Sequence, residues 1–358
     1  MTLCTESEPH SSLLDFQMPA FVMPFPQEVN PLPSPEEATT RWAEMHGLLP
    51  TPASRTRFQE ARFGQLTKLS HPTADKDLLD LMAQWYTWFF LFDDQFDDGP
   101  LGVRPDLVPE MIAPFMGVLN DVSPPATNPL ALALADLWGR TTRGSRSSAW
   151  LRRLARDARS YIDSYRFEAI HRAGNERLGI GEYLAHRKNS TGMRMIFDIF
   201  EIIAQADLPD HVIECEAFLA LRASGVLITG LHNDIIGLEK EVARDYPFNM
   251  VVVAREVQEC SLQHAIDLAN AVTTGHVAAF LTAKSELPGE LDALGVDAAT
   301  KAAAMRTVQE YQRMIRGHYD WSLKTDRLVK IEYTTKDQPP SFLPELLVPH
   351  AVAVQTGS

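Results

Sequence analysis

Apolar side chains recur at spacings of three and four residues over most of the chain, and this periodicity constrains the fold more than any other feature. Side chains at such spacings share one face of an α-helix. Strand-like alternation is scarce, with one short candidate at 250–253. The sequence therefore predicts an all-α protein. The clearest predicted helices are 78–92, 111–119, 130–137, 150–170, 195–206, 212–236, 251–272 and 302–321.

Proline, glycine and asparagine interrupt this pattern and predict where the helices end. No internal repeat or low-complexity linker separates the segments, so we interpret the interruptions as loops within one domain. The proline-rich residues 1–35 are predicted to form an extended arm on the body. The helical domain is expected over 36–335, and a C-terminal tail over 336–358. Breaks are expected at 99–100, 123–125, 175, 208–209, 246–247 and 287–289.

The composition is that of an ordinary folded protein, with 45% apolar and 22% charged residues among 358. The formal net charge of −14 argues against nucleic acid or an anionic membrane surface as the main partner. Cys4, Cys215 and Cys260 are odd in number and lack metal-binding spacing, so a cytoplasmic location is expected. No signal peptide is recognisable, and the longest apolar stretch, 81–92, is too short for membrane insertion.

Four aspartates stand at the C-terminal end of the predicted helix 78–92. Asp93 and Asp97 are four residues apart, as are Asp94 and Asp98, so each pair shares a helix face. Like charges at this spacing destabilise a helix by roughly 0.2–0.5 kcal/mol, and the helix dipole disfavours anions at this end. A bound cation would make the arrangement favourable, and carboxylate oxygens suit Mg²⁺. The alternative is a solvated acidic helix end.

A second constellation places Asn233, Gly237 and Glu241 at intervals of four residues. On a helix, an amide oxygen and a carboxylate two turns apart can bind one divalent ion. A glycine inside a helix costs about 1 kcal/mol relative to alanine. Its presence suggests that a close approach or solvent matters at this position. The alternative is an exposed charged helix.

A third constellation is Arg187 followed by Ser190, Thr191 and Gly192. The glycine after two small polar residues predicts a break in a helical region. Arg187 would then project a planar, permanently charged donor toward a cavity. The alternative is an arginine on the surface. Near the end of the chain, Trp321 and Arg327 are six residues apart, which by itself indicates little.

Together these segments resemble class I terpene synthases of the bacterial single-domain type. The segment 93–98 is similar to the aspartate-rich motif of that family, and 233–241 to its Asn–Ser/Thr–Glu metal triad. Arg187 lies 46 positions before Asn233, as the diphosphate-sensing arginine of the family does. The segment 190–192 resembles the following helix break, and 320–327 resembles the C-terminal segment with its Arg–Tyr pair.

The resemblance covers nearly the whole chain, from an N-terminal segment at 23–47 to about Tyr333. Two positions depart from the family pattern. Gly237 replaces the usual Ser or Thr ligand, and a water molecule would fill that coordination position, because Mg²⁺ keeps waters readily. Leu328 replaces the tyrosine after Arg327, which removes one hydroxyl donor to the diphosphate.

The resemblance implies a single α-helical bundle around a central active-site cavity. It also implies Mg²⁺-dependent ionisation and cyclisation of an isoprenoid diphosphate, with farnesyl diphosphate first and geranylgeranyl diphosphate second. Three Mg²⁺ ions are expected, with Mn²⁺ as a possible substitute. The metal positions implied are Asp93, Asp97, Asp98, Asn233, Gly237 (through water) and Glu241.

The same resemblance assigns residues to the two ends of the substrate. The carbonyl of Thr191 would face the nascent allylic cation. The expected donors to the diphosphate are Arg187, Lys240 and Arg327. Aromatic faces stabilise desolvated cations without reacting with them. The positions that match cavity-lining aromatics of the family are Phe89, Phe90 and Trp321.

Two other functions remain open from the sequence. A chain-elongating prenyl diphosphate synthase shares the helical fold, but it has a second aspartate-rich motif where this chain has the Asn233–Glu241 stripe. A helical Mg²⁺-binding protein without activity is the other alternative, because of Gly237 and Leu328. A homodimer is possible, since it is common in the family.

Overall fold

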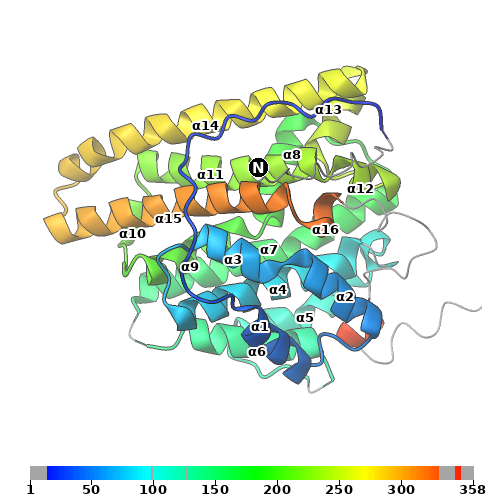
Figure 1. Cartoon of the computed structure of the whole chain (residues 1–358), viewed down its shortest axis with the longest axis horizontal. Helices are drawn as coiled ribbons and strands as arrows, with labels where there is room; N and C mark the ends of the chain where they lie inside the picture. Colours follow the sequence, from blue (N-terminus) through cyan, green and yellow to red (C-terminus); the bar gives the residue numbers. More distant parts are fainter. Residues whose placement is uncertain (1–13, 98–99, 126, 145, 330–342, 348–358) are drawn as a thin grey trace, which may run out of the picture.

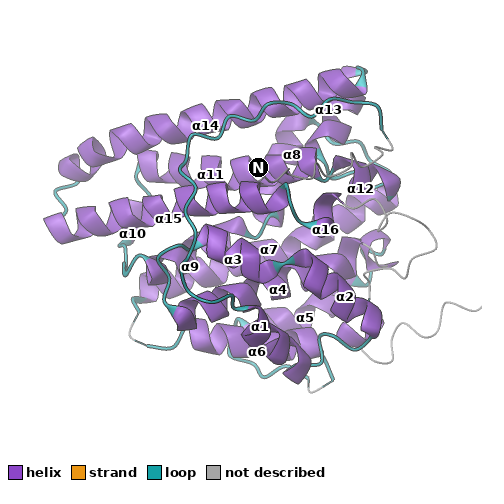
Figure 2. Cartoon of the chain, viewed as in Figure 1, coloured by secondary structure: helices purple, strands orange, loops and turns teal. Residues whose placement is uncertain are grey.

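The computed structural model describes residues 14–97, 100–125, 127–144, 146–329 and 343–347. These residues form helices joined by loops and contain no strand, so the predicted all-α fold is confirmed (Figure 2). In chain order the helices are α1 (Glu36–Met45), α2 (Pro52–Ala61), α3 (Phe63–Ser70), α4 (Lys76–Asp97), η1 (Pro100–Val103), α5 (Val108–Val118), α6 (Pro129–Thr141), α7 (Ser148–Gly174), α8 (Ile180–Ser190), α9 (Met193–Ile203), α10 (Asp210–Ile213), α11 (Glu216–Ile236), α12 (Leu238–Ala243), α13 (Met250–Gln258), α14 (Leu262–Ala293), α15 (Ala298–Ser322), α16 (Asp326–Val329) and η3 (Pro344–Leu346).

Helix α4 lies inside the bundle and is buried on nearly all sides from Leu79 to Phe96. A helix that is apolar all round must be surrounded by other helices. The indole N–H of Trp85 donates to Thr141 Oγ1 at 2.9 Å, and that of Trp88 donates to the carbonyl of Leu130 at 2.9 Å. Both bonds attach α4 to α6. The acidic end of α4 is therefore held by a rigid core.

Helix α4 packs against α1, α3, α6 and η1, and α14 lies at the opposite edge of the bundle beside α11 (Figure 1). Helix α11 lies along α14 and α15, α15 also lies along α3, and α7 packs against α5, α8 and α9. Within the described residues, no helix is both long enough and apolar enough to cross a bilayer.

The described part of the N-terminal arm, residues 14–35, contains no helix and runs across α14 and α15 to reach α1 (Figure 1). Phe21 packs its ring against His232 at 5.0 Å and Tyr319 at 5.6 Å. The side-chain amide of Asn30 donates to the carbonyl of His71 at 2.8 Å. The start of α1 at Glu36 follows the last proline of the arm. The division into arm, body and tail stays a prediction, because the boundary at 335–336 lies outside the described residues.

Three predicted helix boundaries are wrong. The predicted helix 212–236 is divided, because α10 ends at Ile213 and the extended backbone of Cys215 precedes the start of α11 at Glu216. The predicted break at 287–289 does not occur, because α14 continues through Pro288 to Ala293. Leu287 and Leu291, on either side of this proline, are fully buried in the core, and this packing outweighs the lost backbone hydrogen bond. Conversely, the predicted helix 251–272 is divided at Glu259, whose φ of 47° is left-handed. Ser261 then starts α14 by accepting a hydrogen bond from His264 N.

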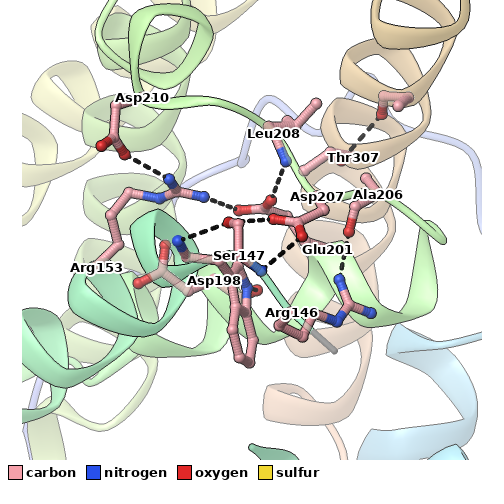
Figure 3. A network of polar contacts seen from close by, with 12 residues as sticks. Arg146, Ser147, Arg153, Asp198, Glu201, Ala206, Asp207, Leu208, Asp210 and Thr307 are labelled. Atoms are coloured by element: carbon pink, nitrogen blue, oxygen red, sulfur yellow. Dashed lines mark hydrogen bonds and ion pairs between the residues drawn. The ribbon is translucent and has the colours of Figure 1, made fainter. Parts of the chain in front are cut away.

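A buried ion-pair network joins the start of α7 to the end of α9 (Figure 3). Arg153 donates to Glu201 Oε1 and to Asp210 Oδ1, both at 2.8 Å. The second oxygen of Glu201 accepts from Leu208 N at 2.7 Å. The side chains of Arg153 and Glu201 are 4% and 0% exposed. The network fixes α9, whose other end borders the cavity described below.

Replacing Arg153 by Met should lower the free energy of unfolding by about 3–5 kcal/mol, because it leaves the buried carboxylate of Glu201 without its counter-ion. The matched control is Arg152→Met, since Arg152 is 67% exposed and lies 3.5 Å from Asp210. That change should cost less than about 1 kcal/mol. Urea unfolding followed by circular dichroism measures both. Equal losses in the two variants would contradict the role given to the buried pair.

Candidate active site

Two adjoining cavities lie at the C-terminal end of α4. Phe90, Asp93 and Asn233 line both of them, so the cavities meet at these residues. The inner cavity is mostly apolar and aromatic, with walls from α3, α4, α7, α8, α9, α11 and α15. The outer cavity is polar and charged. Besides the three shared residues it is lined by Asp97, Lys240, Glu241, Arg244, Tyr246, Arg327 and Leu328.

The adjacent carboxylates Asp93 and Asp94 both lie near Arg327, but Asp93 is 3.9 Å from it and Asp94 is hydrogen-bonded to it. Asp93 faces both cavities, and its Oδ1 accepts a hydrogen bond from the hydroxyl of Tyr165 at 2.8 Å. Burial raises the pKa of Asp93 to about 6. Asp94 binds both terminal nitrogens of Arg327, at 2.6 and 3.0 Å. Burial would raise the pKa of Asp94, but the charge of Arg327 outweighs it and lowers that pKa. Asp98 lies outside the described residues.

Asn233 and Glu241 reach the outer cavity across the junction of α11 and α12. Gly237 donates its N–H to the carbonyl of Asn233 at 2.8 Å, and Glu241 N donates to the carbonyl of Gly237 at 3.1 Å. The helical spacing is therefore kept through the junction. Gly237 offers no side-chain oxygen, and a Cβ added there would stand 3.0 Å from the carbonyl oxygen of Asn233.

Asn249 orients Glu241 from the start of α13. Its side-chain amide donates to Glu241 Oε2 at 2.6 Å and to the carbonyl of Asp234 at 2.7 Å. Its Oδ1 accepts from Val251 N, which caps α13. Burial, with repulsion from Asp234, raises the pKa of Glu241 to about 8. The role of Asn249 was not predicted, although an Asn before an apolar helical segment is a recognisable cap.

Arg187 is not a surface arginine, since its side chain is 15% exposed and lines the inner cavity. Its Nη2 donates to Asp234 Oδ1 at 2.6 Å and to Asn233 Oδ1 at 3.3 Å. Asp234 is fully buried and also accepts from the hydroxyl of Tyr183 and from Met250 N. The role of Asp234 as the anchor of Arg187 was not predicted from the sequence, although Asp234 lies next to the predicted ligand Asn233.

The predicted helix break at Gly192 is present. Helix α8 ends at Ser190, Thr191 follows as its C-cap on the wall of the inner cavity, and α9 begins at Met193. Gly192 has φ +67°, and a Cβ there would stand 2.8 Å from the ring of Phe89. Both the backbone conformation and the space therefore require glycine.

The aromatic residues divide between the cavity wall and the packing behind it. Phe89 and Phe90 line the inner cavity. Trp321 is not among the lining residues: it lies behind Phe90, with ring centroids 5.5 Å apart, and its indole donates to the carbonyl of Ala61. Tyr86 lines the cavity but was not singled out, although it precedes Phe90 by one helical turn.

The oxygen atoms that line the outer cavity are suitable ligands for a hard cation. Oxygen ligands are offered by Asp93, Asp97, Asn233 and Glu241. Burial raises the pKa values of Asp93 and Glu241, so their charged forms are costly unless a cation binds. Within the part of the chain that the structure describes, no three His, Cys, Asp or Glu side chains form a complete metal site. Mg²⁺ is commonly held by one or two carboxylates together with water and phosphate oxygens, which this arrangement allows.

Replacing Gly192 by Ala should lower the free energy of unfolding by about 1–3 kcal/mol, because alanine is strained at positive φ and its Cβ meets the ring of Phe89. Gly181→Ala is the matched control on the same side of the bundle, since a Cβ at Gly181 meets nothing within 4 Å. That change should leave stability the same or raise it slightly. Chemical denaturation of both variants measures the difference, and a neutral Gly192→Ala would contradict the argument.

The sequence and the fold of this chain match those of known proteins. Residues 84–278 match the model of the terpene synthase family 2, C-terminal metal binding. The (2Z,6E)-hedycaryol synthase of Kitasatospora setae is 29% identical over 316 residues, covering 88% of this chain and 93% of the relative. Pentalenene synthase of Streptomyces exfoliatus is 31% identical over 315 residues, covering 84% and 93%.

A third relative, from Roseiflexus castenholzii, is named (+)-T-muurolol synthase ((2E,6E)-farnesyl diphosphate cyclizing). It is 30% identical over 293 residues, which cover 82% of this chain and 87% of the relative. The solved structure of hedycaryol synthase in complex with nerolidol superposes with a TM-score of 0.73 at 29% identity, covering 86% of this chain and 100% of that one. The chain therefore belongs to the family of metal-binding terpene synthases.

Proposed function

We propose that this terpene synthase ionises and cyclises farnesyl diphosphate to a sesquiterpene hydrocarbon or alcohol and releases diphosphate. The observation that carries the proposal is the junction of the two cavities. An aromatic-lined cavity suited to an isoprenoid chain meets, at Asp93 and Asn233, a polar cavity with oxygen donors and cationic side chains suited to a diphosphate. The substrate printed in the name of the Roseiflexus relative supports the fifteen-carbon chain.

The outer cavity would hold the diphosphate. Bound Mg²⁺, expected as three ions and replaceable by Mn²⁺, would supply positive charge that stabilises the leaving group. Asp93, Asp97 and Asp98 would hold metal on one side. On the other side the metal would bind Asn233 and Glu241, with water in place of a side chain at Gly237. Lys240 lines this cavity with Arg327, and Arg187 lies at the inner cavity, so all three would donate charge-assisted hydrogen bonds to the diphosphate.

The inner cavity would hold the carbocation. The faces of Phe89 and Phe90 would each stabilise a desolvated cation by roughly 1–2 kcal/mol without reacting with it. Thr191 follows the last turn of α8, where the carbonyl groups carry partial negative charge. Its carbonyl would face the allylic carbon as the diphosphate leaves. Trp321 would support the ring of Phe90 from behind and would not contact the carbocation itself.

One assay separates this proposal from its alternatives. The pure protein is incubated with Mg²⁺ and geranyl, farnesyl or geranylgeranyl diphosphate, with and without isopentenyl diphosphate, and the products are identified by gas chromatography and mass spectrometry. A fifteen-carbon hydrocarbon or alcohol is expected. A twenty-carbon product would indicate a diterpene synthase, and a longer diphosphate made only with isopentenyl diphosphate would indicate chain elongation. No turnover of any substrate would indicate a metal-binding protein without activity. The expected homodimer and cytoplasmic location stay predictions.

Replacing Asp93 or Glu241 by Ala should lower kcat/KM for farnesyl diphosphate at least about 100-fold, since each removes a carboxylate that would bind metal. Circular dichroism and thermal unfolding should show the fold retained. Glu256→Ala removes an exposed carboxylate on α13 and serves as the control with unchanged activity. Wild-type rates in the Asp93 or Glu241 variant would contradict the assignment of the metal site.

The affinity for Mg²⁺ with inorganic diphosphate should rise as the pH increases from 6 to about 8.5. Burial raises the pKa of Glu241 to about 8 and that of Asp93 to about 6, so at lower pH a proton occupies the group that must bind metal. Titration calorimetry in buffers of different ionisation enthalpy measures both the affinity and the protons released. Glu241→Gln should flatten the dependence above pH 7, and an affinity independent of pH in the wild type would contradict this expectation.

A further inference from the structure

His318 is a buried histidine on the wall of the inner cavity that the mechanism above does not use. It lies on α15, one helical turn after Met314, and both residues line the cavity. Its side chain is almost completely enclosed, with a residue exposure of 6%. The imidazole is thus one of the few basic groups that border the space where a carbocation would form.

Hydrogen bonding decides which nitrogen of His318 carries the proton. The hydroxyl of Ser322 donates to the carbonyl oxygen of His318 at 2.7 Å, which uses its one hydrogen. The same hydroxyl oxygen lies 3.3 Å from His318 Nδ1. Since that oxygen can now only accept, Nδ1 must carry the hydrogen, and Nε2 keeps its lone pair.

The lone pair of Nε2 has no partner within the part of the protein that the structure describes. Among the described residues, Nε2 of His318 has no hydrogen-bond partner, yet the atom is not fully buried. It therefore keeps accessible surface, in contrast to both ring nitrogens of the neighbouring His232, which are buried without partners. Nδ1 is turned toward Ser322 along α15, which leaves the Nε2 edge of this cavity-lining residue with accessible surface.

The imidazole is neutral before the reaction. Burial, together with the nearby charges of His232 and Arg187, lowers the pKa of His318 to about 3. A neutral imidazole can accept a proton from a carbocation, which is a far stronger acid. The low pKa also means that the imidazolium formed would pass its proton on readily.

We propose that Nε2 of His318 accepts the proton that ends the carbocation reaction and sets an alkene as the product. This inference rests on the proposed function. A C–H bond next to the last cationic carbon breaks, and its electron pair forms the new C=C bond. The proton moves to Nε2 and is then passed to water or to the departing diphosphate, which restores the neutral ring.

The first test compares His318→Phe, which keeps an aromatic ring without a base, with His264→Phe, which makes the same change at an exposed histidine on α14. Diphosphate release and the product mixture are measured with farnesyl diphosphate and Mg²⁺. In His318→Phe, the rate of diphosphate release should stay within about threefold of the wild-type rate. The alkene fraction of the products should fall at least about tenfold, with alcohols formed in its place. His264→Phe should keep the wild-type rate and product mixture.

Ser322→Ala should lower the alkene fraction less than His318→Phe does. It keeps the imidazole and removes only the hydroxyl oxygen that accepts the hydrogen of Nδ1. His318→Gln gives a second reading if the phenylalanine variant does not fold. An unchanged alkene fraction in the active His318 variants, an equal change in His264→Phe, or a wild-type enzyme that makes only alcohols would overturn the proposal. No turnover by the wild type would overturn the proposed function together with it.

A second measurement does not depend on turnover. The ¹⁵N NMR spectrum of the histidine-labelled protein at neutral pH, assigned by comparison with His318→Gln, reports the hydrogen on each ring nitrogen. Nδ1 of His318 should be protonated and Nε2 unprotonated, and Ser322→Ala should weaken this preference. A hydrogen on Nε2 in the wild-type protein would overturn the inference whatever the substrate.

Discussion

The buried ion pair between Arg187 and Asp234 holds the two sides of the site in place. It joins the last turn of α8 to the end of α11, and it is accompanied by the hydroxyl of Tyr183 and the N–H of Met250 on the same carboxylate. A buried pair is tolerated only when its remaining hydrogen-bonding groups are satisfied, as they are at Asp234. A Cβ at Gly230 would stand 2.8 Å from Thr191, so glycine is what allows the two helices this close approach.

The charges of the site explain how an acidic chain can bind an anion. The formal net charge is −14, yet the outer cavity has Lys240 and Arg327 beside Asp93 and Glu241. Burial raises the pKa of both carboxylates, which shows that their charge is costly without a partner cation. Divalent ions bound there would invert the local sign and make a diphosphate favourable. The acidic composition therefore speaks against nucleic acid but not against this substrate class.

The helical periodicity predicted most of the fold, because amphipathic helices must bury their apolar stripes whatever their neighbours are. The prediction failed where tertiary packing or backbone conformation outweighed the local sequence preference. Pro288 stays inside α14, since the buried neighbours Leu287 and Leu291 pack it into the bundle. Glu259 breaks a periodic segment through a left-handed φ, for which its side chain gives no signal.

The site was predictable to the extent that its residues are spaced along single helices. Asp93 with Asp97, and Asn233 with Glu241, share a cavity because helical geometry repeats nearly every four residues. Contacts between distant segments were not predictable in this way. The pairing of Asp94 with Arg327, and the position of Trp321 behind Phe90, depend on where α4, α15 and α16 meet.

By itself the sequence determined the all-α class, the order of the motifs and the helical face on which each charged group lies, because these follow from spacing within one element. The tertiary structure alone decided which carboxylates are neutralised by arginine, which aromatic rings reach the cavity, and that His318 borders it. The physical reason is that burial and partner choice are set by side chains that come together from different helices. A sequence pattern within one helix does not indicate which residues of other helices will lie beside it.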